Sequence, residues 1–484
     1  MMQHMPNEIL AHIFSNLECK DAEDEEDPKS SYSSLLSLSR VCKKFRPLAE
    51  ASLYTNIFLL EEDDGRRWQQ LATDLQRDPK LGLNTKQLCI GRFDHIASPD
   101  LIHSLAKHFL NFSLSTDCDS IPPGLRTVIL RELESDIWDR PYPSLRALFL
   151  LLMPRLQKID LTLNDMNSMP FLLSERFNRD EDYGCDGLES DKGRSRHDLV
   201  PNTRYFRDLE TVALRVGYDS PNAPPTRART LRGLLYHPNI KALKLDGFVL
   251  LRGSCIGLCH SNVPSNLTSL DFDNCALTPY LLKRILERFR NLKHLNLALE
   301  GFGGHDDPTS NLEDFGSVLR EFGQNLVELS ISKPIYDPQL AGPHNYVGSL
   351  RELTGLRHLY IGRLNLVGST GEGTEQQIML HDALPQSLEI LTLEPGVKGC
   401  SCDLNIVRQT EQQVCNMLRL RQAPPTLKQV HMKPPPGPEA RGHQMHEVVE
   451  LGGWQIGKKG VWVRRRGNPG FGMIHFLATA TRVE

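Results

Sequence analysis

The fold is decided by a stretch near the middle of the chain, LTSLDFDNCAL, which covers residues 267–277. Apolar residues occupy its first, fourth and sixth positions, Leu267, Leu270 and Phe272. Alternate side chains of a strand point to opposite faces, so positions four and six share one face and positions three, five and seven share the other. One such strand cannot bury its apolar face alone, but stacked copies can. The stretch therefore predicts one strand of a repeat array.

The same pattern, L-x-x-L-x-L with any aliphatic residue allowed, recurs in order along the chain. Leu88 and Ile90 are a possible start of the series, with Thr85 in the first slot. The first positions of successive copies are 25 to 39 residues apart, except for one interval of 53 residues, and such a period is typical of repeat architectures. Their apolar positions are Leu125/Val128/Leu130, Leu156/Ile159/Leu161, Leu209/Val212/Leu214, Ile240/Leu243/Leu245, Leu267/Leu270/Phe272, Leu292/Leu295/Leu297, Leu326/Leu329/Ile331, Leu356/Leu359/Ile361, Leu388/Leu391/Leu393 and Leu427/Val430/Met432.

Helices are predicted between the strands. Thr278 is a suitable N-cap and Pro279 a suitable first-turn residue, and apolar residues follow at helical spacing up to Phe289. Similar segments begin at Ser98 and at Leu312. An alternation of strand and helix indicates an α/β fold with a parallel sheet.

Positions nine and eleven extend the resemblance to a known repeat family. The leucine-rich-repeat consensus has Asn or Cys at position nine, followed by an apolar residue, and both Cys275 with Leu277 and Asn164 with Met166 meet it. Residues 81–433 therefore resemble an irregular leucine-rich-repeat solenoid, and the resemblance implies a horseshoe with a parallel inner sheet. Residues 174–202 are rich in Asp, Arg, Gly and Ser and are interpreted as a flexible insertion.

A proline-rich segment, KPPPGPE at residues 433–439, marks the predicted end of the array, because proline continues neither a helix nor a central strand. Residues 434–484 are interpreted as a C-terminal cap. Within them, residues 454–456 and 461–463 flank a Gly-Lys-Lys-Gly segment at 457–460, which predicts a hairpin turning there.

The N-terminal residues do not follow the repeat. A helix from Pro6 would carry a single apolar stripe, made by Ile9, Leu10, Ile13, Phe14 and Leu17. An acidic linker at 18–27 follows, most simply a solvated loop, and then SLLSLSRVCKKFRPLAEASLYTNI, with apolar residues at helical spacing. So small a module buries a marginal core, and its stripe has more apolar residues than that core needs.

Residues 1–58 resemble an F-box, most closely the form common in fungal F-box proteins. The resemblance rests on P-x-E-I-L from Pro6, I-F at residues 13–14, and L-S-x-V-C-x-x-F ending at Phe45. Met5 stands where Leu is usual, Phe45 where many members have Trp, and the linker between the halves is longer than usual. The resemblance implies contacts to the Skp adapter of a cullin–RING ligase at Pro6, Ile9, Leu10, Ile13, Phe14, Leu36, Val41, Cys42 and Phe45.

An F-box followed by leucine-rich repeats implies a substrate receptor of an SCF-type ubiquitin ligase, with no catalytic site, metal or cofactor of its own. The alternative is a leucine-rich-repeat scaffold that acts outside ubiquitination. An ordinary helical cap on the solenoid is the third interpretation of the N-terminal stripe.

Composition and charge argue against several classes of protein. The net charge is −4, with 56 basic and 60 acidic residues, so no membrane or nucleic-acid partner is expected. The 11 cysteines favour a reducing compartment, and a cytoplasmic or nuclear location is expected. Cys255, Cys259, His260 and Cys275 lack zinc-finger spacing and are not expected to bind a metal.

The expected target-binding surface is the polar strand face. Asp246, Asp271 and Asp273 fall at positions five and seven of adjacent repeats, so they should cluster. A solvated acidic face is one interpretation of this cluster. The other is a cradle for a basic segment of the target, with flanking contacts from His294, His358 and Tyr360.

Overall fold

A computed structural model describes the chain at residues 6, 10, 13, 28–59, 66–78, 80–91, 146, 149–150, 152–163, 206–216, 231–235, 237–250, 265–299, 312–332, 346–368, 379–394, 404–432, 441–451, 454–464 and 471–482. Several sequence predictions lie outside these residues. They are the strand at 125–130, the helix from Ser98, the linker at 18–27 and the insertion at 174–202.

The chain folds as two compact units. The first comprises residues 1–224, 228–243 and 260–266, and the second comprises 225–227, 244–259 and 267–484. The boundary falls within strand β5 (Ala242–Asp246).

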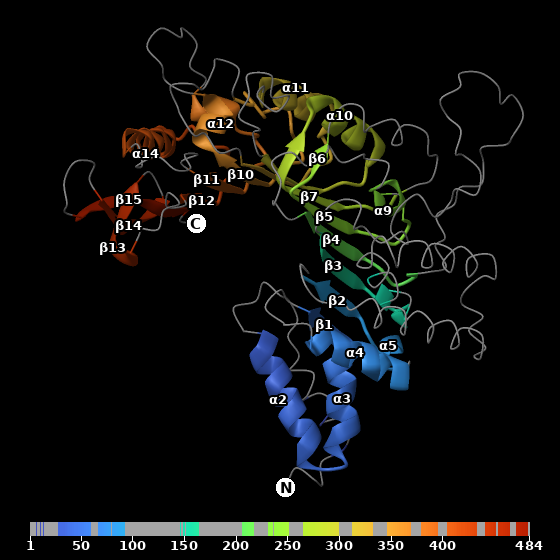
Figure 1. Ribbon diagram of the computed structural model, residues 1–484. Coiled ribbons are helices and arrows are strands. Elements are labelled where there is room, and N and C mark those ends of the chain that lie inside the picture. The colour runs from blue at the N-terminus through green and yellow to red at the C-terminus, as the bar shows by residue number, and fades with distance from the viewer. Residues whose placement is uncertain are drawn as a thin grey trace, which may run out of the picture. The chain divides into compact units, whose positions relative to one another are not determined.

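The first unit begins with helices and continues with parallel strands (Figure 1). Its strands pair in chain order, β1 with β2, β2 with β3 and β3 with β4. The helices are α2 (Pro28–Val41), α3 (Phe45–Thr55), α4 (Arg66–Arg77), α5 (Lys80–Leu83) and α9 (Arg232–Leu235). The strands are β1 (Asn56–Leu59), β2 (Gln87–Ile90), β3 (Lys158–Leu163) and β4 (Thr211–Val216).

Strand β1 was not predicted from the sequence. Helix α3 ends at Thr55 and β1 begins at the next residue, with Ile57 and Leu59 buried. Asn56 pairs with Gln87, and the four residues of β1 run parallel to β2. The N-terminal helical module is therefore joined to the sheet without an intervening loop, and the expected domain boundary at residue 58 cuts through a strand.

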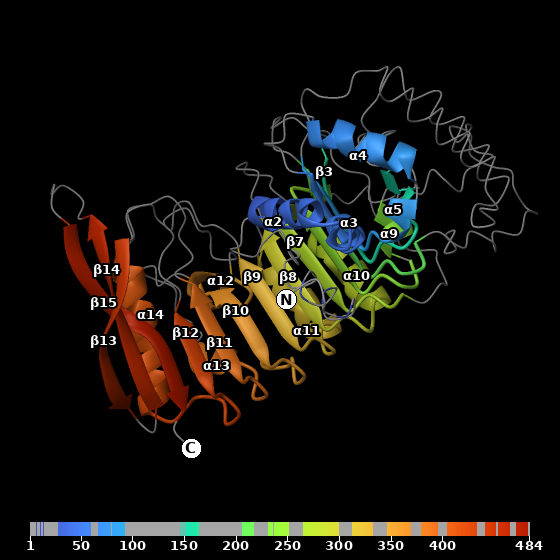
Figure 2. The same ribbon diagram turned by 90° about the horizontal axis from the view of Figure 1, so that it is seen from below.

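The second unit is also built from parallel strands in chain order, which lie side by side in Figure 2. Its strands after β5 are β6 (Val249–Leu250), β7 (Ser269–Leu277), β8 (His294–Leu299), β9 (Glu328–Ser332), β10 (His358–Gly362), β11 (Ile390–Glu394), β12 (Gln429–Met432), β13 (Arg441–Leu451), β14 (Trp454–Arg464) and β15 (Phe471–Arg482). The helices are α10 (Pro279–Arg288), α11 (Leu312–Phe322), α12 (Arg363–Val367), α13 (Leu380–Ala383) and α14 (Leu404–Arg419).

The predicted apolar positions form the core of each strand. Leu292, Leu295 and Leu297 are at most 2% exposed, and the equivalent residues of the other described copies are also buried. Positions three, five and seven lie on the opposite face and are half-buried or exposed in β5, β7 and β8. The α/β architecture expected from the sequence is present in the described residues, with a small helical N-terminal region followed by parallel strands.

A second repeating feature was not foreseen. The residue just before position one carries a polar side chain that donates a hydrogen bond to a carbonyl oxygen of the preceding copy. Asn325 Nδ2 donates to Arg290 O at 3.0 Å, Ser387 Oγ to Leu356 O at 2.7 Å and Thr426 Oγ1 to Leu388 O at 2.8 Å. In these three copies the bonds give main-chain carbonyls of the preceding copy a hydrogen-bond partner.

Helices α10 and α11 match the sequence prediction. The hydroxyl of Thr278 accepts a hydrogen bond from Leu281 N at 3.3 Å, and Pro279 occupies the first turn, so the expected cap starts α10. In α11, Gly316 faces the carbonyl of Val347, and a Cβ at this position would lie 1.9 Å from that oxygen. The glycine therefore permits a close approach of two main chains.

The C-terminal segment differs from the prediction. Residues 454–464 form one continuous strand, β14, so the hairpin turn predicted at 457–460 is wrong. Both β13 and β15 pair with β14 in antiparallel register, and β15 also pairs with β12. A paired strand can accommodate Gly457 and Gly460. The local spacing of the residues alone did not distinguish a continuous strand from a hairpin turn.

Within the described residues, no helix is both long enough and apolar enough to cross a membrane.

Candidate functional site

The N-terminal module is a small cluster of helices with its own apolar core. Helices α2 and α3 lie side by side (Figures 1 and 2). The core consists of Leu10, Leu35, Phe45 and Ala49, against which five partly buried residues pack: Ile13, Leu38, Cys42, Leu48 and Leu53. The two sequence segments predicted to form this module therefore do pack together.

The residues expected to contact the adapter divide into two groups. Leu10 is 1% exposed and Phe45 is 3% exposed, so both belong to the module's core and are not available to a partner in this conformation. The accessible group has Val41 at 62% exposure, an exposed Pro6, and the half-buried Ile13, Leu36 and Cys42. Ile9 and Phe14 lie outside the described residues. The resemblance to the F-box implied all nine contacts, but it did not show which of these residues the module's own core would bury.

Helix α2 starts earlier than the sequence suggested. It begins at Pro28, so the last seven residues before Leu35 are helical rather than part of a loop. Proline is well suited to a first turn, because it lacks the N–H that would otherwise lack a partner there. Because α2 begins at Pro28, fewer residues separate the two halves of the module than the apolar pattern alone suggests.

A comparison with protein families supports the interpretation of this helical module. The family described as F-box-like matches residues 2–60. The chain therefore carries an F-box-like domain, which ends one residue after β1, and this domain supports a role in binding the adapter of an SCF ubiquitin ligase. Proteins with this domain are typically non-catalytic adapters. No curated protein matches the chain.

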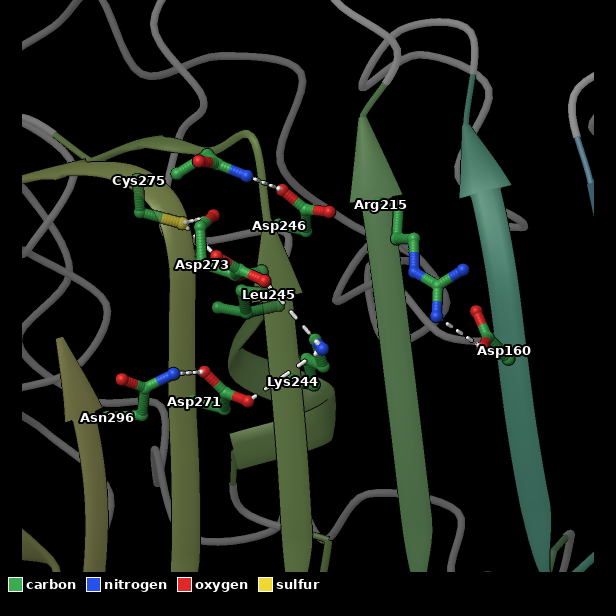
Figure 3. Close-up of polar contacts among 10 residues, drawn as sticks. Asp160, Arg215, Lys244, Leu245, Asp246, Asp271, Asp273, Cys275 and Asn296 are labelled. Carbon is green, nitrogen blue, oxygen red and sulfur yellow. Dashed lines mark hydrogen bonds and ion pairs between the residues drawn. The ribbon is translucent and has the colours of Figure 1, made fainter. Parts of the chain in front are cut away.

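The second candidate site is the polar face of the strands in the second unit. Lys244 of β5 lies between two carboxylates of β7, with Nζ 4.0 Å from Asp271 Oδ2 and 3.7 Å from Asp273 Oδ2 (Figure 3). Asn296 of β8 donates a hydrogen bond to Asp271, and Asn274 Nδ2 donates to Asp246 Oδ1 at 3.1 Å. The three aspartates lie on neighbouring strands, where one lysine offsets part of their negative charge and two amides donate hydrogen bonds to them.

The contribution of Lys244 was missed because sequence spacing gives the face of a side chain and not its reach. Lys244 stands at position five of its copy, and its four-carbon stem carries the ammonium group across to the neighbouring strand. Its side chain is 29% exposed, so solvent screens these ion pairs only in part. The cluster is therefore less repulsive than three aspartates at this spacing would be alone.

The expected flanking residues are not all near the aspartates. Strand β10 is the third strand after β7, so His358 and Tyr360 are roughly 14 Å away across the sheet. His294 is closer, on β8, where its Nδ1 lies 3.0 Å from Glu328 Oε2. Tyr360 donates a hydrogen bond to Glu394 Oε2 at 2.9 Å, and burial together with the charge of Glu394 raises the pKa of its hydroxyl. These contacts are further polar pairs, one between β8 and β9 and one between β10 and β11.

In the first unit the polar face also carries an ion pair between neighbouring strands. Arg215 Nη2 of β4 lies 3.0 Å from Asp160 Oδ2 of β3 (Figure 3). Cross-strand pairs of opposite charge stabilise a sheet by roughly 0.2–1 kcal/mol.

Cys275 is a structural residue in this face and not a ligand or nucleophile. Its side chain is buried, its thiol donates to Leu245 O and Asp273 O at 3.2 Å each, and Phe248 N donates to its sulfur at 3.4 Å. The bonds with Leu245 and Phe248 join β7 to the preceding copy of the pattern. Across the residues that the structure covers, no group of three His, Cys, Asp or Glu side chains could hold a metal. Cys255, Cys259 and His260 lie outside those residues.

We expect Cys275 to resist alkylation while Cys42 reacts. Burial raises the pKa of the Cys275 thiol, and the neutral thiol is a poor nucleophile because the thiolate is the reactive form. Cys42 is half-buried at the end of α2 and is accessible to reagent. Iodoacetamide labelling at pH 8, followed by peptide mass spectrometry, measures both rates in one sample. Labelling of Cys275 at the rate of Cys42 in the folded protein would contradict its enclosure.

Proposed function

We propose that this chain is a substrate receptor of an SCF-type cullin–RING ubiquitin ligase. The F-box-like domain binds the Skp adapter, and the strand array binds a target protein. The observation that carries the proposal is the F-box-like domain at residues 2–60, which is followed through β1 by strands whose polar residues are half-buried or exposed. The receptor needs no catalytic group, because it raises the local concentration of target lysines near the conjugating enzyme.

We propose further that the array is a leucine-rich-repeat solenoid, of irregular period, with the parallel strands on its inner wall. Three features support this interpretation. The strands follow chain order, positions one, four and six are buried, and Cys275 at position nine bonds to the main chain of the preceding copy. The affinity with fungal F-box proteins rests on the sequence alone.

The target in this proposal presents a basic segment. Positions three, five and seven of the described strands β5 to β12 carry the carboxylates of Asp246, Asp271, Asp273, Glu328 and Glu394. Among the described residues at those positions, Lys244 carries the positive charge. The face is therefore negative on balance, and it favours a lysine- or arginine-rich partner over a phosphorylated or nucleic-acid one. A cytoplasmic or nuclear location belongs to the same proposal.

A non-catalytic scaffold outside ubiquitination remains the alternative, and co-purification separates the two. The test compares the full chain with its Val41→Glu variant while the proteasome is inhibited. Truncation at residue 58 is unsuitable because it would remove most of β1 and leave β2 without its neighbour. If the proposal holds, adapter and cullin disappear with Val41→Glu and target candidates persist. Absence of adapter and cullin from the unchanged protein would favour the scaffold.

We expect Asp271→Lys with Asp273→Lys to release the target and leave adapter binding intact. The double change replaces two carboxylates around Lys244 with two more cations, so the local field reverses and association with a basic segment slows. Co-purifying proteins are quantified for both chains at physiological salt. Glu210→Lys with Glu287→Lys, two exposed or half-exposed acids away from this face, is the matched charge control. An unchanged set of partners for the aspartate variant would exclude this patch as the recognition surface.

A further inference from the structure

A pocket of about 440 Å³ lies in the first unit, where α2, α3, β1 and α4 meet. Its apolar wall includes Leu35 from α2, Ile57 and Leu59 from β1, and Leu71 from α4, all of them at most 7% exposed. A volume of this size falls in the range of pockets that bind small molecules, which are typically apolar with a few placed polar groups.

One side of the pocket is a satisfied polar network around Asp74, which is 7% exposed. Its carboxylate accepts a hydrogen bond from the Tyr54 hydroxyl at 2.7 Å and from Gln70 Nε2 at 3.0 Å, and Arg77 Nη2 lies 3.1 Å from it. With three donors already present, Asp74 has little need of a cation from a ligand. The network instead fixes the shape of this wall.

The remaining charges of the lining favour an anion. Glu50 is paired with Arg46, whose Nε lies 2.9 Å from Glu50 Oε1. Both carboxylates of the lining therefore have an arginine partner. Arg40, an exposed residue of α2 at the edge of the pocket, has no ion pair with any residue in the described part of the chain. Guanidinium groups bind carboxylates through paired hydrogen bonds.

We propose that this pocket binds a small amphipathic organic anion. Its apolar body packs against Leu35, Ile57 and Leu71, and its carboxylate pairs with Arg40. The walls come from two helices of the F-box-like domain, from the first strand of the sheet and from α4. A bound ligand would therefore contact both the adapter-binding module and the array, and it would stabilise their junction against local opening.

Decanoate is the probe for the test, titrated into the full-length chain by isothermal titration calorimetry. We expect saturable binding at one site, and no comparable binding of decyltrimethylammonium, which has the same chain and the opposite charge. Arg40→Glu should weaken decanoate binding by roughly tenfold or more, since a charged hydrogen bond is replaced by repulsion. Lys43→Glu, the same charge change at an exposed residue of the same module outside the pocket lining, should leave the affinity unchanged.

A second variant tests the location independently of charge. Ser39 is a half-buried residue of the lining on α2, so Ser39→Trp should place an indole in the pocket and abolish binding. Circular dichroism melting confirms that each variant is folded. Equal affinities of Arg40→Glu and Lys43→Glu, retention of binding by Ser39→Trp, or equal binding of the cationic probe would each overturn the proposal.

Discussion

Val41→Glu is expected to reduce adapter binding by roughly a hundredfold while the rest of the protein stays folded. Val41 is the last residue of α2 in the F-box-like domain, and it is 62% exposed next to Cys42, which packs against the module's apolar core. A carboxylate at the centre of an apolar contact would lose its hydration without gaining a partner, and truncation or charge at such a position commonly costs 2 kcal/mol or more.

Purified Skp adapter titrated against each variant in surface plasmon resonance gives the affinities. The chain supplies a matched control, because Leu420 in the second unit is also 62% exposed. Leu420→Glu makes the same chemical change outside the F-box-like domain and should leave the affinity as it is. If Val41→Glu and Leu420→Glu both bind the adapter with the affinity of the wild type, the assignment of this surface to the adapter is refuted. Leu10 and Phe45 are unsuitable for this test because their loss would unfold the module's core.

Gly316→Ala is expected to destabilise the second unit by about 3 kcal/mol, against the direction that helix propensity alone predicts. In a helix interior, alanine is favoured over glycine by about 1 kcal/mol. At Gly316, however, the added Cβ would lie 1.9 Å from Val347 O, so α11 or the segment at Val347 must move. Arg320 Nη1 donates to the same oxygen at 3.0 Å and to Ser349 O at 3.2 Å, which holds this segment in place. Overpacking of this kind commonly costs 1–3 kcal/mol.

Urea unfolding of the wild type and the variant measures the difference. Glu321→Ala, an exposed change near the end of the same helix, should change stability by no more than about 0.5 kcal/mol. A Gly316→Ala protein as stable as the wild type, or more stable, would show that the two main chains do not approach this closely in solution.

The sequence was sufficient to predict where the strands of the array lie, but not which partners their side chains contact. Every described copy of L-x-x-L-x-L lies in or directly before a parallel strand in chain order, because a period-two pattern of apolar residues leaves one face to bury. Strand β1 was missed because Ile57 and Leu59 form only a short alternation that continues an amphipathic helix. Its assignment as a strand depends on pairing with β2, in which the partner of Asn56 is Gln87.

In the candidate sites, too, the sequence predicted the position of residues but not their contacts. The stripes on the F-box-like domain were found from helical spacing, but the burial of Leu10 and Phe45 and the exposure of Val41 depend on how α2 and α3 pack. The aspartates were placed correctly on one face. The partners Lys244 and Asn296, and the pairing of Tyr360 with Glu394, depend on the reach and rotamers of side chains on neighbouring strands. No one-dimensional pattern records those.

The pairing of β12 with β15 has a consequence for the protein during its synthesis. On the ribosome, each parallel strand of the second unit finds its neighbour already made, about 30 residues earlier, so the sheet can be extended as translation proceeds. Strand β12 is different, because the strand beside it is β15, which emerges after β13 and β14. The edge of β12 therefore stays open in the nascent chain until residues 479–481 have been released. A premature stop codon before residue 471 would leave that edge permanently unpaired, a ready template for aggregation.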